Sequence, residues 1–145
     1  MAALIYPSTR YEPAPVVDLT ARDEQERLSP AALRAFFNIM QRWSVRDDDA
    51  RQLLGGVSNG PYYDMKKHPD GRVLAADTLL RISYLAGIFQ ALNVVHGQQL
   101  ADEWMQLPNG NRIFGGSSPL TYIVHGGLPA MQTVRRLLEA RAAGM

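Results

Sequence analysis

The stretch from Ala75 to Val95 constrains the fold more than any other, because it is the most apolar segment of the chain and its apolar residues repeat at helical spacing. A helix that is apolar on two sides lies at the centre of a domain, or covers both its own core and a second subunit. One apolar stripe consists of Leu80, Tyr84, Ile88 and Ala91. We expect dimerisation through the other stripe, which consists of Ile82, Leu85, Phe89 and Leu92.

The composition limits what surrounds this helix. A chain of 145 residues is long enough for one medium domain or for two small ones that share a core. Its 46% of hydrophobic and 20% of charged residues are typical of a globular protein. The net charge of +1 gives no overall field toward nucleic acid or anionic lipid. The absence of cysteine excludes disulfides, thiolate nucleophiles and cysteine-based zinc sites.

The sequence also predicts where the protein resides. Its first residues lack a basic start, and the short apolar run that follows stops at Pro7, so no export signal is predicted. No uninterrupted apolar run approaches the roughly 18 residues of a membrane span. We expect a soluble, cytoplasmic protein that makes no contact with a membrane.

The prolines and glycines that interrupt helices divide the sequence into three predicted regions. Residues 1–27, with Pro7, Pro13 and Pro15, are interpreted as an extended arm that wraps a neighbouring subunit, or alternatively as a frayed terminus. Order is predicted to begin at Ser29–Pro30, a helix cap followed by a proline. Residues 28–97 would form a helix-turn-helix-like and dimerisation domain, and residues 98–145 a smaller helical domain.

The predicted helices leave no segment with strand-like alternation, so the fold class is all-α. After a first helix that ends near Trp43, we expect helices from about Ser44 to Leu54, from Asn59 to Lys67 and from Ala75 to Val95. The second domain is predicted to contain a helix over residues 98–105, a loop rich in glycine, and two helices that start after Ser118 and at Pro129.

Residues suited to catalysis are few. The sequence contains no G-x-x-x-x-G-K-[ST] or G-x-G-x-x-G nucleotide-binding motif and no H-E-x-x-H zinc-protease motif. The histidines His96 and His125 each precede a glycine at a predicted helix end, where an imidazole interacts favourably with the terminal carbonyls. The run Asp47–Asp49 suits a helix N-terminus better than a pair of catalytic carboxylates. We expect no enzyme, no cofactor and no metal site.

The unit from Arg46 to Lys67 has the outline of a helix-turn-helix, with two short helices joined through a Gly-Gly turn. Asn59 could hydrogen-bond to adenine, whereas Asp64 would face the phosphates repulsively. Tyr62 is as consistent with packing as with contact to DNA. The predicted DNA-binding residues are Asn59, Tyr62, Lys66 and Lys67.

Several motifs occur together in a characteristic order. They are Trp43-Ser44, DARQLLG at residues 49–55, LLRISYLAGI at 79–88, LPN at 107–109, FGGSSPL at 114–120 and RRLL at 135–138. In this order they resemble the Xre/MbcA/ParS antitoxins, from about Leu28 to the C-terminus. The motifs up to residue 88 are similar to the Xre-like helix-turn-helix half of those proteins. The motifs from residue 107 onward are similar to their toxin-binding domain.

The resemblance implies the antitoxin of a type II toxin-antitoxin system. Its partner would be a RES-domain toxin, related to ADP-ribosyltransferases and dependent on NAD, whose active site the antitoxin blocks. The resemblance also implies a homodimer that forms a hetero-oligomer with toxin and binds the promoter of its operon. An extra residue near Gly55-Gly56 and the unusual Asn59-Gly60-Pro61 depart from the family pattern and bear on promoter binding. The alternative is a stand-alone helix-turn-helix transcription regulator.

The loop from Leu107 to Gly127 is the main candidate for toxin contact, because glycines and prolines would fix a projecting shape and reduce the entropy lost on docking. One loop rarely supplies enough affinity, so the last helix and its tail are expected to join it. The alternative is an ordinary connector in which Phe114 fills the core. The predicted toxin-binding residues are Asn109, Asn111, Arg112, Phe114, Gly115, Tyr122, Arg135, Arg136, Arg141 and Met145.

Overall fold

The computed structural model describes residues 17–144, and within that range it is helical, with no strand. This confirms the all-α class. The α-helices in chain order are α1 (Arg22–Arg42), α2 (Asp47–Leu53), α3 (Asn59–Lys67), α4 (Ala76–Val95), α5 (Gln98–Trp104) and α6 (Pro119–Ala142). Two short 3₁₀ helices, η1 (Pro69–Gly71) and η2 (Arg112–Phe114), lie in the connections.

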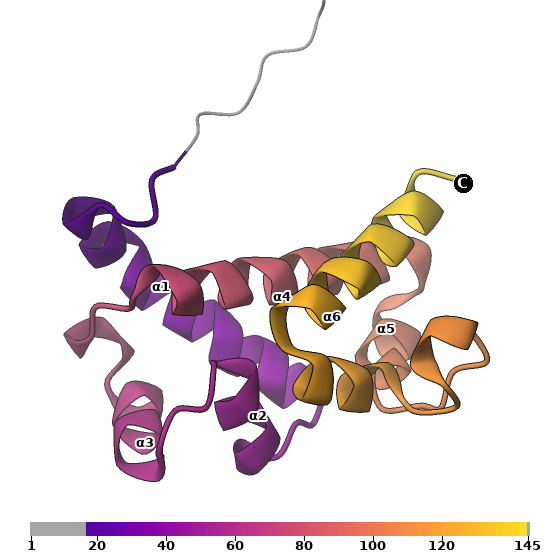
Figure 1. Cartoon of the computed structure of the whole chain (residues 1–145), viewed down its shortest axis with the longest axis horizontal. Helices are drawn as coiled ribbons and strands as arrows, with labels where there is room; N and C mark the ends of the chain where they lie inside the picture. Colours follow the sequence, from indigo (N-terminus) through magenta and orange to yellow (C-terminus); the bar gives the residue numbers. More distant parts are fainter. Residues whose placement is uncertain (1–16, 145) are drawn as a thin grey trace, which may run out of the picture.

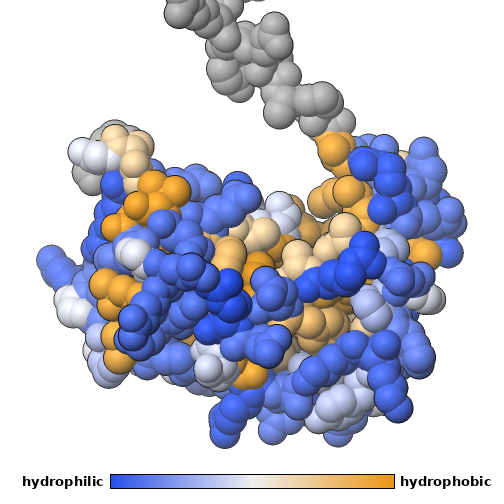
Figure 2. All heavy atoms as spheres, turned by 180° about the vertical axis from the view of Figure 1, so that it is seen from behind, coloured by the Kyte–Doolittle hydropathy of each residue, from blue (hydrophilic) through white to orange (hydrophobic). Residues whose placement is uncertain are grey.

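The helix α4 is the centre of the molecule, as its two apolar stripes predict. It packs mainly against α6 and α1, and also against α5 (Figure 1). By length and composition it is the one helix among the described residues that is apolar enough to cross a membrane, although here it forms the middle of the core. On the face opposite to that of Figure 1, a band of apolar residues stays visible between hydrophilic residues (Figure 2).

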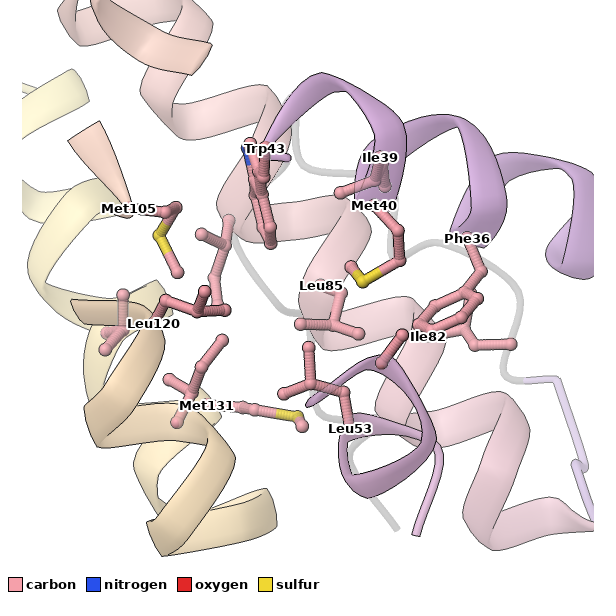
Figure 3. Close-up of a cluster of buried hydrophobic side chains, with 14 of the residues drawn as sticks. Phe36, Ile39, Met40, Trp43, Leu53, Ile82, Leu85, Met105, Leu120 and Met131 are labelled. Carbon is pink, nitrogen blue, oxygen red and sulfur yellow. The ribbon is translucent and has the colours of Figure 1, made fainter. Parts of the chain in front are cut away.

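One hydrophobic core joins the two regions that the sequence separates at residue 97. Met40 and Trp43 of α1 and Leu85 of α4 face Leu120 and Met131 of α6 in the same cluster (Figure 3). Trp43, Leu85 and Met131 are almost entirely removed from solvent. The N-terminal and C-terminal segments are therefore packed as one body, stabilised by the apolar surface they bury together.

The first helix begins earlier than predicted. The structure has α1 starting at Arg22, so the segment from Arg22 to Arg27 is helical and the prediction of an extended arm up to residue 27 is wrong there. Pro30 lies inside the helix, and Ser29 is a buried interior residue that accepts a hydrogen bond from the backbone N–H of Leu74 at 2.7 Å. The acidic Asp23 and Glu24 in the first turn favour this earlier start. The rest of the predicted arm, residues 1–16, lies outside the described residues.

The last two predicted helices are confirmed, and they adjoin each other within α6 at a kink. Gly127 has φ 65° and ψ −147°, a conformation outside the helical region that breaks α6 in the middle. Such a backbone conformation suits glycine, because a Cβ atom would be strained there. The first half of α6 starts with Pro119 at the first helical position, and the second half contains Pro129.

Candidate functional site

The α5–α6 loop, residues 105–118, is held by its own backbone. The N–H of Leu120 donates to the carbonyl of Met105 at 2.9 Å, and the N–H of Asn109 donates to the carbonyl of Ser117 at 3.3 Å. The Ser118 hydroxyl caps α6 by accepting from the N–H of Thr121 at 3.2 Å. These bonds close the loop at both ends, so its shape is set before any partner binds.

The two asparagines of the loop serve the same purpose. The Asn109 side-chain oxygen accepts from the N–H of Asn111 at 2.8 Å, and the Asn111 side-chain oxygen accepts from the N–H of Ile113 at 3.1 Å. This is the turn geometry that asparagine favours, and it caps η2. The side-chain oxygens of both residues are thus engaged within the loop, which leaves their amide N–H groups for a partner. Gly115 follows with φ 56°, in the left-handed region.

Phe114 fills the core and is not available to a partner. Its side chain is 3% exposed. The ring lies edge-on between Trp104 and Tyr122, with centroid distances of 6.0 and 5.4 Å. The prediction that Phe114 contacts a toxin is therefore wrong, and the alternative of a core plug is confirmed. Sequence spacing could not separate the two, because the aromatic residue stands in a short loop without periodicity.

Among the side chains that the loop does present are Leu107, Arg112 and Ile113. Leu107 is 47% and Ile113 is 37% exposed, and Arg112 is exposed as well. Sequence reasoning missed Leu107 and Ile113. A short 3₁₀ turn directs successive side chains to different sides, so an inward Phe114 leaves its neighbour Ile113 outward.

Beside the loop lies a shallow hollow of about 340 Å³, which Phe114, Ser117, Thr121, Tyr122, His125 and Gly126 line. Buried Phe114 and half-buried Tyr122 both belong to its lining. The hollow and the exposed loop side chains belong to one stretch of chain and together form the candidate partner surface.

The three arginines predicted on α6 differ in availability. Arg135 is held against α4, because its guanidinium lies 5.4 Å from the Tyr84 ring centre. It also forms an ion pair with Glu139 of its own helix at 2.7 Å. A Cβ atom added at Gly87 would lie 2.5 Å from Arg135 Nε, so the glycine makes room for this side chain. Arg136 and Arg141 are exposed. Met145 lies outside the described residues.

Cations without an acidic partner gather at the C-terminal end of the sequence. Within residues 17–144, ion pairs engage every arginine and lysine except Lys67, Arg112, Arg136 and Arg141. Three of these four lie in the loop or on α6. An unpaired exposed arginine can form a bidentate ion pair with a carboxylate or phosphate of a partner.

The α2–α3 pair, predicted to bind DNA, uses most of its polar side chains internally. Tyr62 is 1% exposed, and its hydroxyl donates to Asp47 at 2.6 Å. Lys66 donates to the same carboxylate at 3.0 Å, and Tyr63 does so at 3.3 Å. The prediction that Tyr62 contacts DNA is therefore wrong. Asn59 and Lys67 are exposed on α3.

These hydrogen bonds change the acidity of both partners at the Asp47 cluster. The Tyr62 hydroxyl, followed by Lys66, stabilises the carboxylate and lowers the pKa of Asp47 below its usual range. Burial and the nearby Asp47 carboxylate raise the pKa of the Tyr62 hydroxyl above its usual value. Asp47 thus serves at once as a first-turn carboxylate of α2 and as the anchor of α3.

Comparison with known proteins places the chain in a family. It is 35% identical over 116 residues to the uncharacterized protein y4oB of Sinorhizobium fredii (strain NBRC 101917 / NGR234), a match that covers 79% of this chain and 87% of the relative. The chain belongs to the y4oB family. No family model and no solved structure matches it.

The predicted dimerisation stripe of this y4oB-family chain lies mostly in its own core. Ile82, Leu85 and Leu92 are 3% exposed or less, so they cannot form a surface for a second copy, and that part of the prediction is wrong. The side chain of Phe89 is half-buried, with its ring against Trp43 and under the guanidinium of Arg42. Helical periodicity marks apolar faces but does not say which of them the rest of the chain covers.

Within residues 17–144 of this family member, no group of three or more His, Cys, Asp or Glu side chains is placed to hold a metal ion. The first-turn position predicted for Asp47, Asp48 and Asp49 is confirmed.

Proposed function

We propose that this chain is the antitoxin of a type II toxin-antitoxin system, which binds a RES-domain toxin and blocks its NAD-using, ADP-ribosyltransferase-like active site. The observation that carries the proposal is the α5–α6 loop, whose shape its own hydrogen bonds fix while Arg112 and Ile113 point away from the core. A pre-ordered loop loses little entropy on docking, so more of its contact energy appears as affinity. The order of motifs that resembles the Xre/MbcA/ParS antitoxins supports the same assignment.

The contact surface proposed for the toxin extends from the loop to α6. Leu107 and Ile113 supply apolar area, and Arg112, Arg136 and Arg141 supply cations without an acidic partner in the described chain. Among the residues predicted from sequence, Asn109, Asn111, Gly115 and Tyr122 shape this surface. Arg135 supports it by holding α6 against α4.

The proposal also holds that the protein is cytoplasmic, has no catalytic activity, needs no cofactor and makes no contact with a membrane. A homodimer that assembles with toxin remains part of the proposal, although the buried stripe of α4 cannot be its interface.

The proposal predicts that the neighbouring gene encodes a RES-domain protein, and co-expression with that gene's product tests it. A stable complex should be recovered, and NAD consumption by the toxin should stop when the complex forms. The chain alone should consume no NAD. A neighbouring gene that encodes no RES-domain protein, or a purified complex whose toxin still consumes NAD, would remove the basis of the assignment.

The second candidate function is a stand-alone helix-turn-helix regulator that binds promoter DNA. Exposed Asn59 at the start of α3 and Lys67 at its end favour it. Two or three phosphate contacts give weak binding that depends strongly on salt. A promoter fragment that the purified chain does not shift at moderate salt excludes this candidate, and the same assay on the toxin complex tests autoregulation.

A further inference from the structure

An apolar groove runs between α1 and α4 at the surface of the molecule, and part of its lining belongs to the hydrophobic core. Its volume is about 470 Å³, and its walls include Leu28, Ala31 and Ala35 from α1 and Ile82, Ser83 and Ala86 from α4. Ser83 is the one polar side chain among its lining residues. We call it the α1–α4 groove.

The groove remains open because its walls carry small side chains where larger ones would close it. Ala31, Ala35 and Ser83 are exposed to solvent, and Leu28 and Ala86 are half-buried. A continuous apolar surface of this kind on a soluble protein usually marks a binding site.

The start of the described chain forms one wall of the same groove. Val17 and Leu19 line it, and the apolar band of Figure 2 reaches the point where the described chain begins. A turn fixes this wall, because Asp18 accepts from the N–H of Thr20 at 3.0 Å and Gln25 donates to the carbonyl of Leu19 at 2.8 Å. The residues before Val17 are thus tethered at the groove itself.

The sequence before Val17 contains a segment whose chemistry fits. Residues 2–6 read Ala-Ala-Leu-Ile-Tyr and carry no charged side chain. Ten residues lie between Tyr6 and Val17, and the eleven Cα–Cα steps that join the two span up to about 36 Å when extended. The α1 wall from Leu28 to Ala35 is only about 10 Å long at the helical rise per residue. The tether therefore allows residues 2–6 to reach any part of the groove.

We propose that residues 2–6 bind in the α1–α4 groove of their own chain, with Leu4 and Ile5 against the alanines of α1 and α4. The uncharged segment matches a groove without charged walls, and attachment at Val17 gives it a high effective concentration there. This binding does not depend on the proposed antitoxin role. It would fill an apolar surface that a second copy or another protein could otherwise occupy.

Paramagnetic NMR on the full chain tests the proposal. The protein has no cysteine, so Ser8→Cys gives a single attachment site for a nitroxide next to the apolar segment. The methyl signals of Ala35 and Ala86 should lose most of their intensity, whereas those of Ile113 in the α5–α6 loop should keep their intensity. Unchanged groove signals would overturn the proposal.

A mixed sample separates the own chain from a second copy. Chains that carry the nitroxide without isotope label are mixed with isotope-labelled chains that carry none. Binding within one chain predicts no loss of signal in this mixture. Loss at Ala35 and Ala86 in the mixture would show that the segment of a second copy occupies the groove, which also overturns the proposal.

Matched variants of the nitroxide-labelled chain test the chemistry. Leu4→Asp places a charge in the apolar segment and should restore the methyl signal intensity of Ala35 and Ala86. Thr9→Asp adds the same charge outside that segment and should leave those signals weakened. Equal effects of the two substitutions would show that the apolar side chain does not hold the segment, against the proposal.

Discussion

The α5–α6 loop and the α2–α3 pair are both predicted from sequence to bind a partner, and their polar side chains behave differently. In the loop, the short side chains of Asn109 and Asn111 satisfy the backbone, which leaves Arg112 and Ile113 directed outward. In the α2–α3 pair, Tyr62 and Lys66 both turn to Asp47. A binding surface requires side chains that remain unengaged after folding. The loop keeps a cation and two apolar side chains in this state, whereas α3 keeps only its end residues Asn59 and Lys67.

The difference has a physical origin in the position of one carboxylate. Asp47 lies in the first turn of α2, where the helix dipole favours its negative charge, and it also accepts hydrogen bonds from α3. The loop has no acidic residue between Met105 and Ser118, so nothing there attracts Arg112. The distribution of acids along the chain thus decides which cations stay available.

The largest expected effect comes from Phe114→Ala. Deleting a buried aromatic ring should cost about 3–5 kcal/mol of unfolding free energy, because both burial and packing contacts are lost. Urea unfolding followed by circular dichroism measures this cost. Ile113→Ala, at the adjacent exposed position, is the matched control and should change stability by less than about 1 kcal/mol. Equal costs for the two variants would contradict the opposite roles assigned to them.

The next effect concerns binding. If the chain binds a RES-domain toxin as proposed, the double variant Arg112→Ala/Ile113→Ala should weaken that binding by about 2 kcal/mol or more, roughly 30-fold in Kd, because it removes two exposed side chains from a pre-ordered loop. Its unfolding free energy should stay close to that of the unchanged chain. Calorimetric titration of toxin measures the affinity.

The control for that experiment lies on the other surface. Asn59→Ala/Lys67→Ala also removes two exposed side chains, here from α3, and should leave the affinity for toxin unchanged. If the α3 variant weakens toxin binding as much as the loop variant does, the comparison between the two regions fails.

The elements of the fold were predictable because periodicity and breakers act locally. Asn59, Gly127 and Pro129 mark helix boundaries through backbone preferences that the sequence displays directly. The start of α1 was missed because Ser29–Pro30 is a good helix start in isolation. The structure uses Ser29 instead to bond the distant backbone of Leu74.

The candidate site was predictable only as a region. Sequence identified the loop, but the inward direction of Phe114 depends on Trp104 and Tyr122, which the fold brings around it. Likewise, Tyr62 and Lys66 of α3 donate hydrogen bonds to Asp47 of α2, a contact between helices that makes both side chains less available to a partner. Such contacts follow from tertiary packing, which spacing along the chain does not encode.

An intermediate effect is expected from Tyr62→Phe, which removes the hydrogen bond to Asp47. The loss should be about 1.5 kcal/mol, because the acceptor is charged. The raised pKa of Tyr62 in the folded chain adds a pH dependence. The unfolded tyrosine loses its proton near pH 10, so the stabilisation is complete below that pH and declines as pH rises above it. Urea midpoints for both chains between neutral pH and about pH 11 should therefore converge. A constant difference across that range would contradict the raised pKa.

The smallest expected effect separates the two lysines of α3. Lys66 and Asp47 form an exposed ion pair at 3.0 Å, and such pairs contribute about 0–1 kcal/mol, so Lys66→Gln should barely change stability.

Lys67 has no acidic partner within residues 17–144 and is the better candidate for contact with phosphate. If α3 binds DNA, Lys67→Gln should weaken promoter binding and reduce its salt dependence by about one ion, and Lys66→Gln should do so less, because Lys66 would first have to leave Asp47. Fluorescence anisotropy over a salt series measures both. Equal effects of the two substitutions would show that the Asp47 cluster does not restrain Lys66, and the α2–α3 pair would then be as free to bind as the loop.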